Sequence, residues 1–139
     1  MTDITQWTDQ HILACTAYGE NRGGGADGMQ SVINTVMNRA NKPGWWGTTP
    51  REVCLKPKQF DCWMPDDPNY YAILKANTND IVFGSAYIMA QQALSGTLPD
   101  LTHGATYYIA KSIPSWPHWA IGHIPCADIA GQIFFNDID

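Results

Sequence analysis

The first hundred residues carry hydrophobic positions in patterns that predict helices. From about Gln10 to Glu20 the residues are mostly apolar, which is typical of a helix buried in a core. Asp9 is the expected N-cap of this helix, and the glycines at 23–25 are expected to end it. A second helix is predicted from about Ala26 to Ala40, where residues spaced three and four apart form a buried stripe: Met29, Val32, Ile33, Val36 and Met37.

Helix start signals recur at short intervals in the middle of the chain. Thr49 and Glu52 form a capping box around Pro50, and an Asp followed by Pro repeats the signal further along. Three more helices are therefore expected: a short one that stops near Cys54, one from Asp67 through Leu74, and one from about Ile81 to Leu94 that Gly96 ends.

The pattern changes near the C-terminus, where GATYYIA (104–110) and GQIFF (131–135) are rich in strand-forming residues. These segments are expected to pair as an antiparallel hairpin. No repeat or linker interrupts the chain, so residues 1–139 form one predicted domain. The expected fold is mainly α (α+β), a helical body with a small antiparallel hairpin or sheet. Five tryptophans fall in the predicted loops, which suggests a ligand cleft between the two parts: Trp45, Trp46, Trp63, Trp116 and Trp119.

Charge and composition narrow the class of partner. The net charge of −5 argues against a nucleic-acid partner, because phosphate binding relies on clustered Lys and Arg. Every apolar stretch is too short to cross a bilayer, so no membrane partner is expected. The N-terminus has no basic segment followed by an apolar core, so no secretion signal is expected.

The four cysteines do not show the spacing of a zinc site, and neither a metal nor a cofactor is expected. Cys54 and Cys62 are close enough in sequence to bridge a short loop. Cys15 lies in an apolar helical segment and is expected to be a buried thiol.

Glu20 is the main candidate for chemistry. It ends a mostly apolar helix, and Ala17, Thr16 and Leu13 are its neighbours on the helix face. Apolar surroundings and the negative end of the helix dipole both disfavour the ionised carboxylate, so its pKa should rise into the range of a general acid. Glycosidases need such an acid to protonate the leaving sugar oxygen. The alternative is a surface Glu paired with Arg22 or Arg39.

Two further motifs supply candidate substrate-binding residues. In KPKQFDCW, Gln59 offers an amide beside Phe60 and Trp63, which would suit an N-acetyl sugar, although composition alone favours a turn that Phe60 anchors in the core. In ATYYIAKSIPSW, strand alternation places Thr106 and Tyr108 on one face of a strand, from which their hydroxyls could reach a cleft. Ordinary packing of the sheet is the alternative explanation of this pattern. The candidates from this second motif are Thr106, Tyr108, Ser115 and Trp116.

The segments AYGENRGGGADGMQSVINTVMNRA, VCLKPKQFDCW, GATYYIAKSIPSW and IAGQIFF together resemble the SleB-type cell-wall hydrolases. The resemblance runs from about Ile12 to Phe135 and implies a lysozyme-like fold that cuts peptidoglycan glycan strands. It also implies that Glu20 is the catalytic acid, with Gln59, Phe60 and Tyr108 lining the cleft. This chain departs from the family pattern at three places. Many members carry a second acid where this chain has Gly24 and Gly25, a Ser where it has Asp61, and often a His where it has Ile109.

These departures leave the mechanism open between two routes. Hydrolysis by water normally needs a second carboxylate, for which Asp27 and Asp61 are the candidates. Without one, Glu20 serves as acid and then base while the sugar's own 6-hydroxyl attacks, as in a lytic transglycosylase. The resemblance favours this second route for the bond between N-acetylmuramic acid and N-acetylglucosamine.

Other classes of protein are also compatible with parts of the sequence. A non-catalytic glycan-binding module would use the same aromatic loops without Glu20. A peptidoglycan amidase or peptidase would need Cys15 with His103 and Asn136, or a metal held by His103, His118 and His123. The expected setting is a monomeric endolysin-like enzyme of phage or prophage type, made in the cytoplasm and released to the cell wall.

Overall fold

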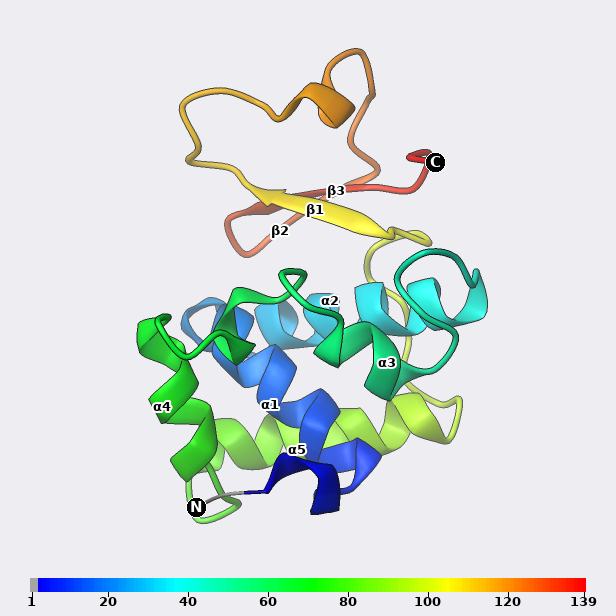
Figure 1. Cartoon of the computed structure of the whole chain (residues 1–139). Helices are drawn as coiled ribbons and strands as arrows, with labels where there is room; N and C mark the ends of the chain where they lie inside the picture. The colour runs from blue at the N-terminus through cyan, green and yellow to red at the C-terminus, as the bar shows by residue number, and fades with distance from the viewer. Residues whose placement is uncertain (1–2) are drawn as a thin grey trace.

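A computed structural model describes residues 3–139 of the chain. Figure 1 shows two parts, a helical body and above it a small sheet with a long loop. Five α-helices make up the body in this part of the chain: α1 (Asp9–Asn21), α2 (Gly25–Asn41), α3 (Pro50–Leu55), α4 (Pro68–Lys75) and α5 (Ile81–Leu94). Short 3-10 turns join or extend them: η1 (Ile4–Gln6), η2 (Arg22–Gly24) and η3 (Asp61–Trp63). A fourth turn, η4 (His118–Ala120), lies in the long loop above the sheet (Figure 1). The predicted fold class is confirmed.

Helix α1 lies at the centre of the body and packs against α2, α3, α4 and α5. Its residues 12–17 are all fully buried, as the apolar run predicts. The predicted stripe of α2 is confirmed at Met29, Val32, Ile33 and Val36, and Met37 packs against it while partly exposed. The core of the molecule therefore forms around the two helices with the clearest sequence patterns.

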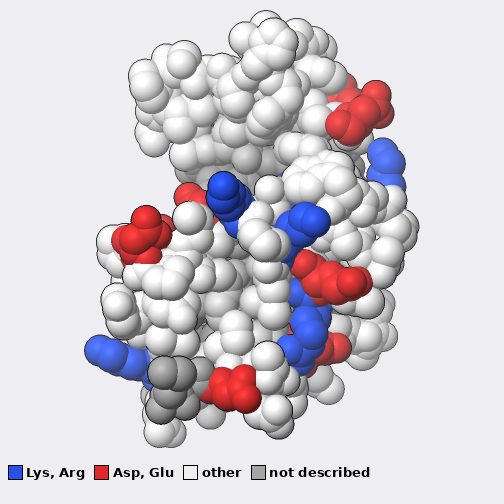
Figure 2. All heavy atoms as spheres, in the orientation of Figure 1, with Lys and Arg blue, Asp and Glu red and all other residues white. Residues whose placement is uncertain are grey.

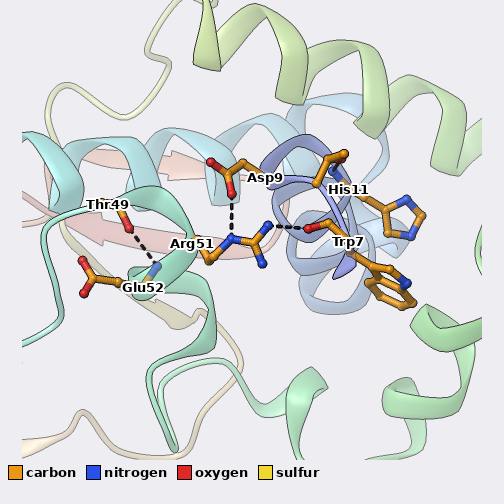
Figure 3. A network of polar contacts seen from close by, with 7 residues as sticks. Trp7, Asp9, His11, Thr49, Arg51 and Glu52 are labelled. Atoms are coloured by element: carbon orange, nitrogen blue, oxygen red, sulfur yellow. Dashed lines mark hydrogen bonds and ion pairs between the residues drawn. The ribbon is translucent and has the colours of Figure 1, made fainter. Parts of the chain in front are cut away.

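The N-cap of α1 is Thr8, and the prediction of Asp9 is wrong by one residue. Thr8 has extended backbone angles and its hydroxyl accepts a hydrogen bond from the backbone N–H of His11 at 3.1 Å. Asp9 is already helical, and its carboxylate pairs with Arg51 Nε of α3 at 2.7 Å. Figure 3 shows that Arg51 also donates to the carbonyl of Trp7, so one guanidinium ties the start of α1 to α3.

The start of α3 has half of the predicted capping box. The Thr49 hydroxyl accepts from the Glu52 backbone N–H at 3.2 Å, and Pro50 follows in the first turn (Figure 3). The Glu52 carboxylate binds the backbone N–H of Thr48 at 3.1 Å rather than that of Thr49. The predicted start of this helix is correct, and the reciprocal contact is shifted by one residue.

The glycines at 23–25 separate α1 from α2 by only one 3-10 turn. Gly25 has φ of 71°, a left-handed conformation that L side chains rarely adopt, and α2 begins there. The two helices therefore meet at a sharp bend, with the end of α1 close to the sheet: Asn21 Nδ2 donates to Gln132 Oε1 of β3 at 3.3 Å.

The sheet contains β1 (Tyr107–Ala110), β2 (Ala127–Ile129) and β3 (Gln132–Phe135), all antiparallel, in the order β1-β3-β2. The predicted pairing of the two C-terminal segments is confirmed, with Tyr108 opposite Phe134. They do not form a simple hairpin, however. The tight hairpin joins β2 to β3 through Ala130 and Gly131, both with positive φ, and β2 is absent from the prediction.

All four cysteines are free thiols, so the proposed bridge between Cys54 and Cys62 is not formed. Both side chains are buried, and Cys62 Sγ lies 4.0 Å from the Thr16 carbonyl of α1. Packing against α1 therefore takes the place of a disulfide here. No helix in the described part of the chain is long and apolar enough to span a membrane.

Candidate active site

Glu20 lies in the last turn of α1, where the helical body meets the sheet. Its Oε2 accepts a hydrogen bond from the backbone N–H of Cys62 at 3.2 Å, and its Oε1 accepts from the Tyr108 hydroxyl at 3.1 Å. Neither Arg22 nor Arg39 pairs with it among residues 3–139. The alternative of a surface ion pair is therefore wrong.

The environment of Glu20 raises its pKa. Burial is the largest cause, because removing the carboxylate from water disfavours its charged form. The bonds from Cys62 and Tyr108 oppose this shift, and the charge of Asp61 adds to it. The result is an acid that holds its proton to higher pH than an ordinary Glu, while two donors stay in place to stabilise the carboxylate once the proton has left.

Glu20 faces a hollow of about 310 Å³ that is open to solvent. Figure 2 shows the surface indented between the helical body and the upper lobe, which consists of the sheet and its long loop. The residues that line the hollow come from the end of α1, the bend that follows it and the start of α4: Gly19, Glu20, Asn21, Arg22, Gly23 and Asn69. A ligand can therefore approach the carboxylate from outside the protein.

Gly19 allows the Cys62 backbone to come close to Glu20. A Cβ at position 19 would lie 2.5 Å from Cys62 Cβ and 2.9 Å from Ile73 Cγ2, both closer than real Cβ contacts. The glycine that precedes the catalytic candidate is therefore explained by packing between α1 and η3.

Gly19→Ala is expected to destabilise the protein by about 1–3 kcal/mol, the usual cost of overpacking a tight contact, and to move Cys62 away from Glu20. Gly23→Ala is the matched control, since no atom lies within 4 Å of the added Cβ and the backbone is helical there. Urea denaturation of both variants measures the difference. Equal stability of the two would contradict this explanation of Gly19.

The side chains of Gln59, Phe60 and Trp63 in the KPKQFDCW segment do not line the hollow beside Glu20. Phe60 is 3% exposed and belongs to the core, as the packing alternative predicts. Trp63 donates from Nε1 to the Thr16 hydroxyl at 2.9 Å, and Gln59 Oε1 accepts from Arg39 Nη1 at 3.4 Å. The group from this segment that reaches Glu20 is the Cys62 backbone amide, for which the sequence pattern gives no signal.

In the ATYYIAKSIPSW segment, too, some of the candidate residues lie at the site and others do not. Tyr108 binds Glu20, while the ring centroid of the neighbouring Tyr107 lies 4.8 Å from that of Trp119. Thr106 precedes β1, is 3% exposed, and its hydroxyl has no hydrogen-bond partner among the described residues. Ser115 and Trp116 lie in the loop of the upper lobe and do not line the Glu20 hollow. Of the four candidates in this segment, Tyr108 is the one that contacts the Glu20 carboxyl.

The two candidate second carboxylates lie in different places. Asp61 begins η3, one residue before Cys62, and its charge acts on Glu20. Asp27 lies in the first turn of α2, as expected from the helix dipole, and lines another hollow together with Asp128. Of these two carboxylates, Asp61 is therefore the one whose charge influences Glu20.

The thiol and metal alternatives do not fit this arrangement. Cys15 is fully buried, and burial raises the pKa of its thiol to about 12, so it is no nucleophile at neutral pH. Asn136 Nδ2 donates to the His103 carbonyl at 2.9 Å on an exposed surface, whereas Cys15 lies in the core. Within residues 3–139 no group of three His, Cys, Asp or Glu side chains is arranged to hold a metal ion.

Comparison with known proteins supports a relationship over most of the chain. The family model described as Cell Wall Hydrolase matches residues 23–135, a range that begins just after Glu20. The catalytic domain of the Bacillus cereus SleB protein is similar in fold, with a TM-score of 0.70, 22% identity, and coverage of 91% of this chain and 88% of that one.

A second similar structure is the catalytic domain of the germination-specific lytic transglycosylase SleB from Bacillus anthracis. It has a TM-score of 0.70 and 23% identity, and the alignment covers 97% of this chain and 99% of that chain. A search by sequence among curated proteins gives no significant match. At these identities the two structures establish a shared fold over most of the chain.

Proposed function

Because the chain belongs to the cell wall hydrolase family, we propose that it cuts peptidoglycan glycan strands between N-acetylmuramic acid and N-acetylglucosamine, with Glu20 as general acid. The observation that carries this proposal is the half-buried Glu20 carboxyl, held by Cys62 N–H and the Tyr108 hydroxyl beside an open hollow. A raised pKa and access to ligand are the two properties that glycosidic bond cleavage requires of its acid.

The proposed reaction is that of a lytic transglycosylase. Glu20 gives its proton to the glycosidic oxygen as the bond from that oxygen to the muramic acid C1 breaks. The resulting carboxylate, stabilised by Cys62 and Tyr108, takes the proton from the sugar's 6-hydroxyl, whose oxygen bonds to C1. The product is a 1,6-anhydro end, and no water is consumed.

Two observations favour this route. A single acid that can return to its protonated form is sufficient: burial favours the protonated Glu20, and the donors from Cys62 and Tyr108 stabilise the carboxylate that forms in between. The relative from Bacillus anthracis is described as a lytic transglycosylase, and it shares the fold over nearly the whole chain. Both are consistent with the Glu-only mechanism.

Hydrolysis is the second candidate, because Asp61 is exposed and close enough to influence Glu20. In that reaction Asp61 would activate a water molecule that attacks C1. Asp61→Asn then removes the base, whereas the same change should leave transglycosylation nearly unaffected.

Digestion of purified peptidoglycan in ¹⁸O-labelled water distinguishes the two reactions. Mass spectrometry is expected to find 1,6-anhydromuramic ends without the heavy isotope. Reducing ends that carry ¹⁸O would instead show that water attacks and would favour the Asp61 route. Freed stem peptides with intact glycan strands would overturn the proposal and return the question to an amidase or peptidase.

The wider setting remains a prediction. We expect a monomer that is released from the cytoplasm of an infected or lysogenic cell and acts on the wall after release. Size-exclusion chromatography with light scattering checks the monomer. Addition of the protein to intact and to permeabilised cells checks whether release is needed, since only permeabilised cells should lyse.

A further inference from the structure

Arg39, in the last turn of α2, is a buried cation without an anionic partner. Its exposed fraction is 6%, and no carboxylate among residues 3–139 forms an ion pair with it. Aromatic rings surround the guanidinium carbon instead, at 5.9 Å from the Trp45 centroid, 5.1 Å from Trp46, 5.7 Å from Phe60 and 5.1 Å from Tyr107. Such rings stabilise a cation through their π faces, which explains how the charge is tolerated.

The guanidinium connects two segments that are far apart in the sequence. Its Nε donates to the Thr106 carbonyl at 2.7 Å, and its Nη1 donates to Gln59 Oε1 at 3.4 Å. Thr106 stands directly ahead of β1, and Gln59 stands in the loop that leads into η3. Arg39 is thus hydrogen-bonded to both the sheet and the loop between α3 and η3.

These two segments are the same ones that supply the hydrogen-bond donors to Glu20. Tyr108 lies on β1 shortly after Thr106, and Cys62 lies in η3 shortly after Gln59. We propose that Arg39 is a positioning residue, which fixes the Tyr108 hydroxyl and the Cys62 amide at the spacing that Glu20 needs. This proposal rests on the glycan-cleaving function of Glu20 proposed above.

The chemistry of the side chain supports this role. A guanidinium is planar and presents its donors in a fixed fork, so it can hold two acceptors at a defined separation, whereas a lysine ammonium is a single point charge on a flexible stem. A buried cation without a counter-ion carries a desolvation cost that an apolar side chain of similar length, such as methionine, avoids. Arg39→Met should therefore fold.

The test uses the two glutamates of the chain, Glu20 and Glu52. With ¹³C-labelled Glu, the carboxyl carbons give two NMR titration curves, and the exposed Glu52 serves as the internal control. Turnover on soluble glycan fragments is measured in parallel for the wild type, Arg39→Met and Arg39→Lys. The thermal unfolding midpoint reports whether each variant is folded.

We expect both variants to fold, with kcat lowered about 10- to 100-fold and KM little changed, since small misplacements of catalytic groups have effects of this size. The Glu20 titration midpoint should move, while that of Glu52 stays. A folded Arg39→Met protein with an unmoved Glu20 midpoint, or with wild-type kcat, would reduce Arg39 to a packing residue and overturn the proposal.

Gln59→Leu provides an independent variant if the Arg39 variants do not fold, because Gln59 is partly exposed and its loss removes only one acceptor. A smaller shift of the same Glu20 midpoint is then expected, and an unchanged midpoint overturns the proposal. Failure of the proposed function gives a different result from failure of the Arg39 proposal. A wild-type protein that cuts no glycan would overturn the function, while the two titration curves could still be measured and would still test the role of Arg39.

Discussion

Glu20→Gln is expected to lower the rate of glycan cleavage by about 10²–10⁴-fold, the usual contribution of a general acid. Gln has the shape of Glu and cannot release a proton to the leaving oxygen. Its amide oxygen can accept from the Cys62 N–H while its nitrogen donates to the Tyr108 hydroxyl, so the site should keep its geometry. New chain ends released from purified peptidoglycan measure the rate.

Glu52→Gln is the matched control for this change. Glu52 is exposed, lies at the start of α3 and binds Thr48 rather than any residue of the Glu20 hollow. Its replacement should leave the cleavage rate within about twofold, as is common for surface substitutions that cost little stability. Equal losses from the two replacements would contradict the assignment of Glu20.

Glu20→Gln also tests the raised pKa of Glu20, through the pH dependence of protein stability. Because burial raises the pKa of Glu20 above its ordinary 4.5, the folded protein binds this proton more tightly than the unfolded chain. The stabilisation is complete below the ordinary pKa and is lost as the pH rises through the folded pKa. Relative to wild type, Glu20→Gln should therefore gain thermal stability with rising pH, and a difference independent of pH would contradict the buried environment.

Sequence periodicity was sufficient to predict the helical body. The stripe of Met29, Val32, Ile33 and Val36 and the apolar run of α1 are buried as expected, because helix faces of this kind must pack against other elements. Start signals placed α3, α4 and α5 within about two residues. These features depend on residues close together in the chain, which sequence patterns report directly.

The errors concern contacts between distant segments. Strand β2 has only three residues and an exposed Asp128 in the middle, and it exists because β3 offers it a partner. Cys54 and Cys62 are near in sequence, yet both pack toward α1. Asp9 is of a residue type that often caps helices, but here its carboxylate pairs with Arg51, which lies far away in the sequence. None of these partners can be read from local sequence.

The candidate site shows the same limit. Glu20 stands out because a carboxylate ends an apolar helix, and the resemblance to SleB-type hydrolases points to Tyr108. The Cys62 donor is a backbone amide, which leaves no trace in side-chain composition. Phe60 and Trp63 have the composition of a sugar-binding surface, but they pack into or against the core, because aromatic residues serve both purposes.

Tyr108→Phe is expected to move the alkaline limb of the activity profile to higher pH. The Tyr108 hydroxyl donates to Glu20 Oε1 and so lowers the pKa of this carboxyl, against the larger effect of burial. Without that donor the pKa of Glu20 rises further. Because Glu20 must be protonated to act, activity falls about tenfold per pH unit above this pKa, and the fall should begin later in the variant.

The maximal rate of Tyr108→Phe should be about 10- to 100-fold lower, since a hydrogen bond to a charged group contributes roughly 1.5–3 kcal/mol. At high pH this loss is partly offset by the larger protonated fraction of Glu20, so the two profiles should converge as the pH rises. Tyr71→Phe, an exposed tyrosine on α4, is the control and should give the wild-type profile. Parallel profiles for Tyr108→Phe and wild type would mean that Tyr108 does not set the protonation of Glu20, and the acid would then be controlled by burial and the Cys62 amide alone.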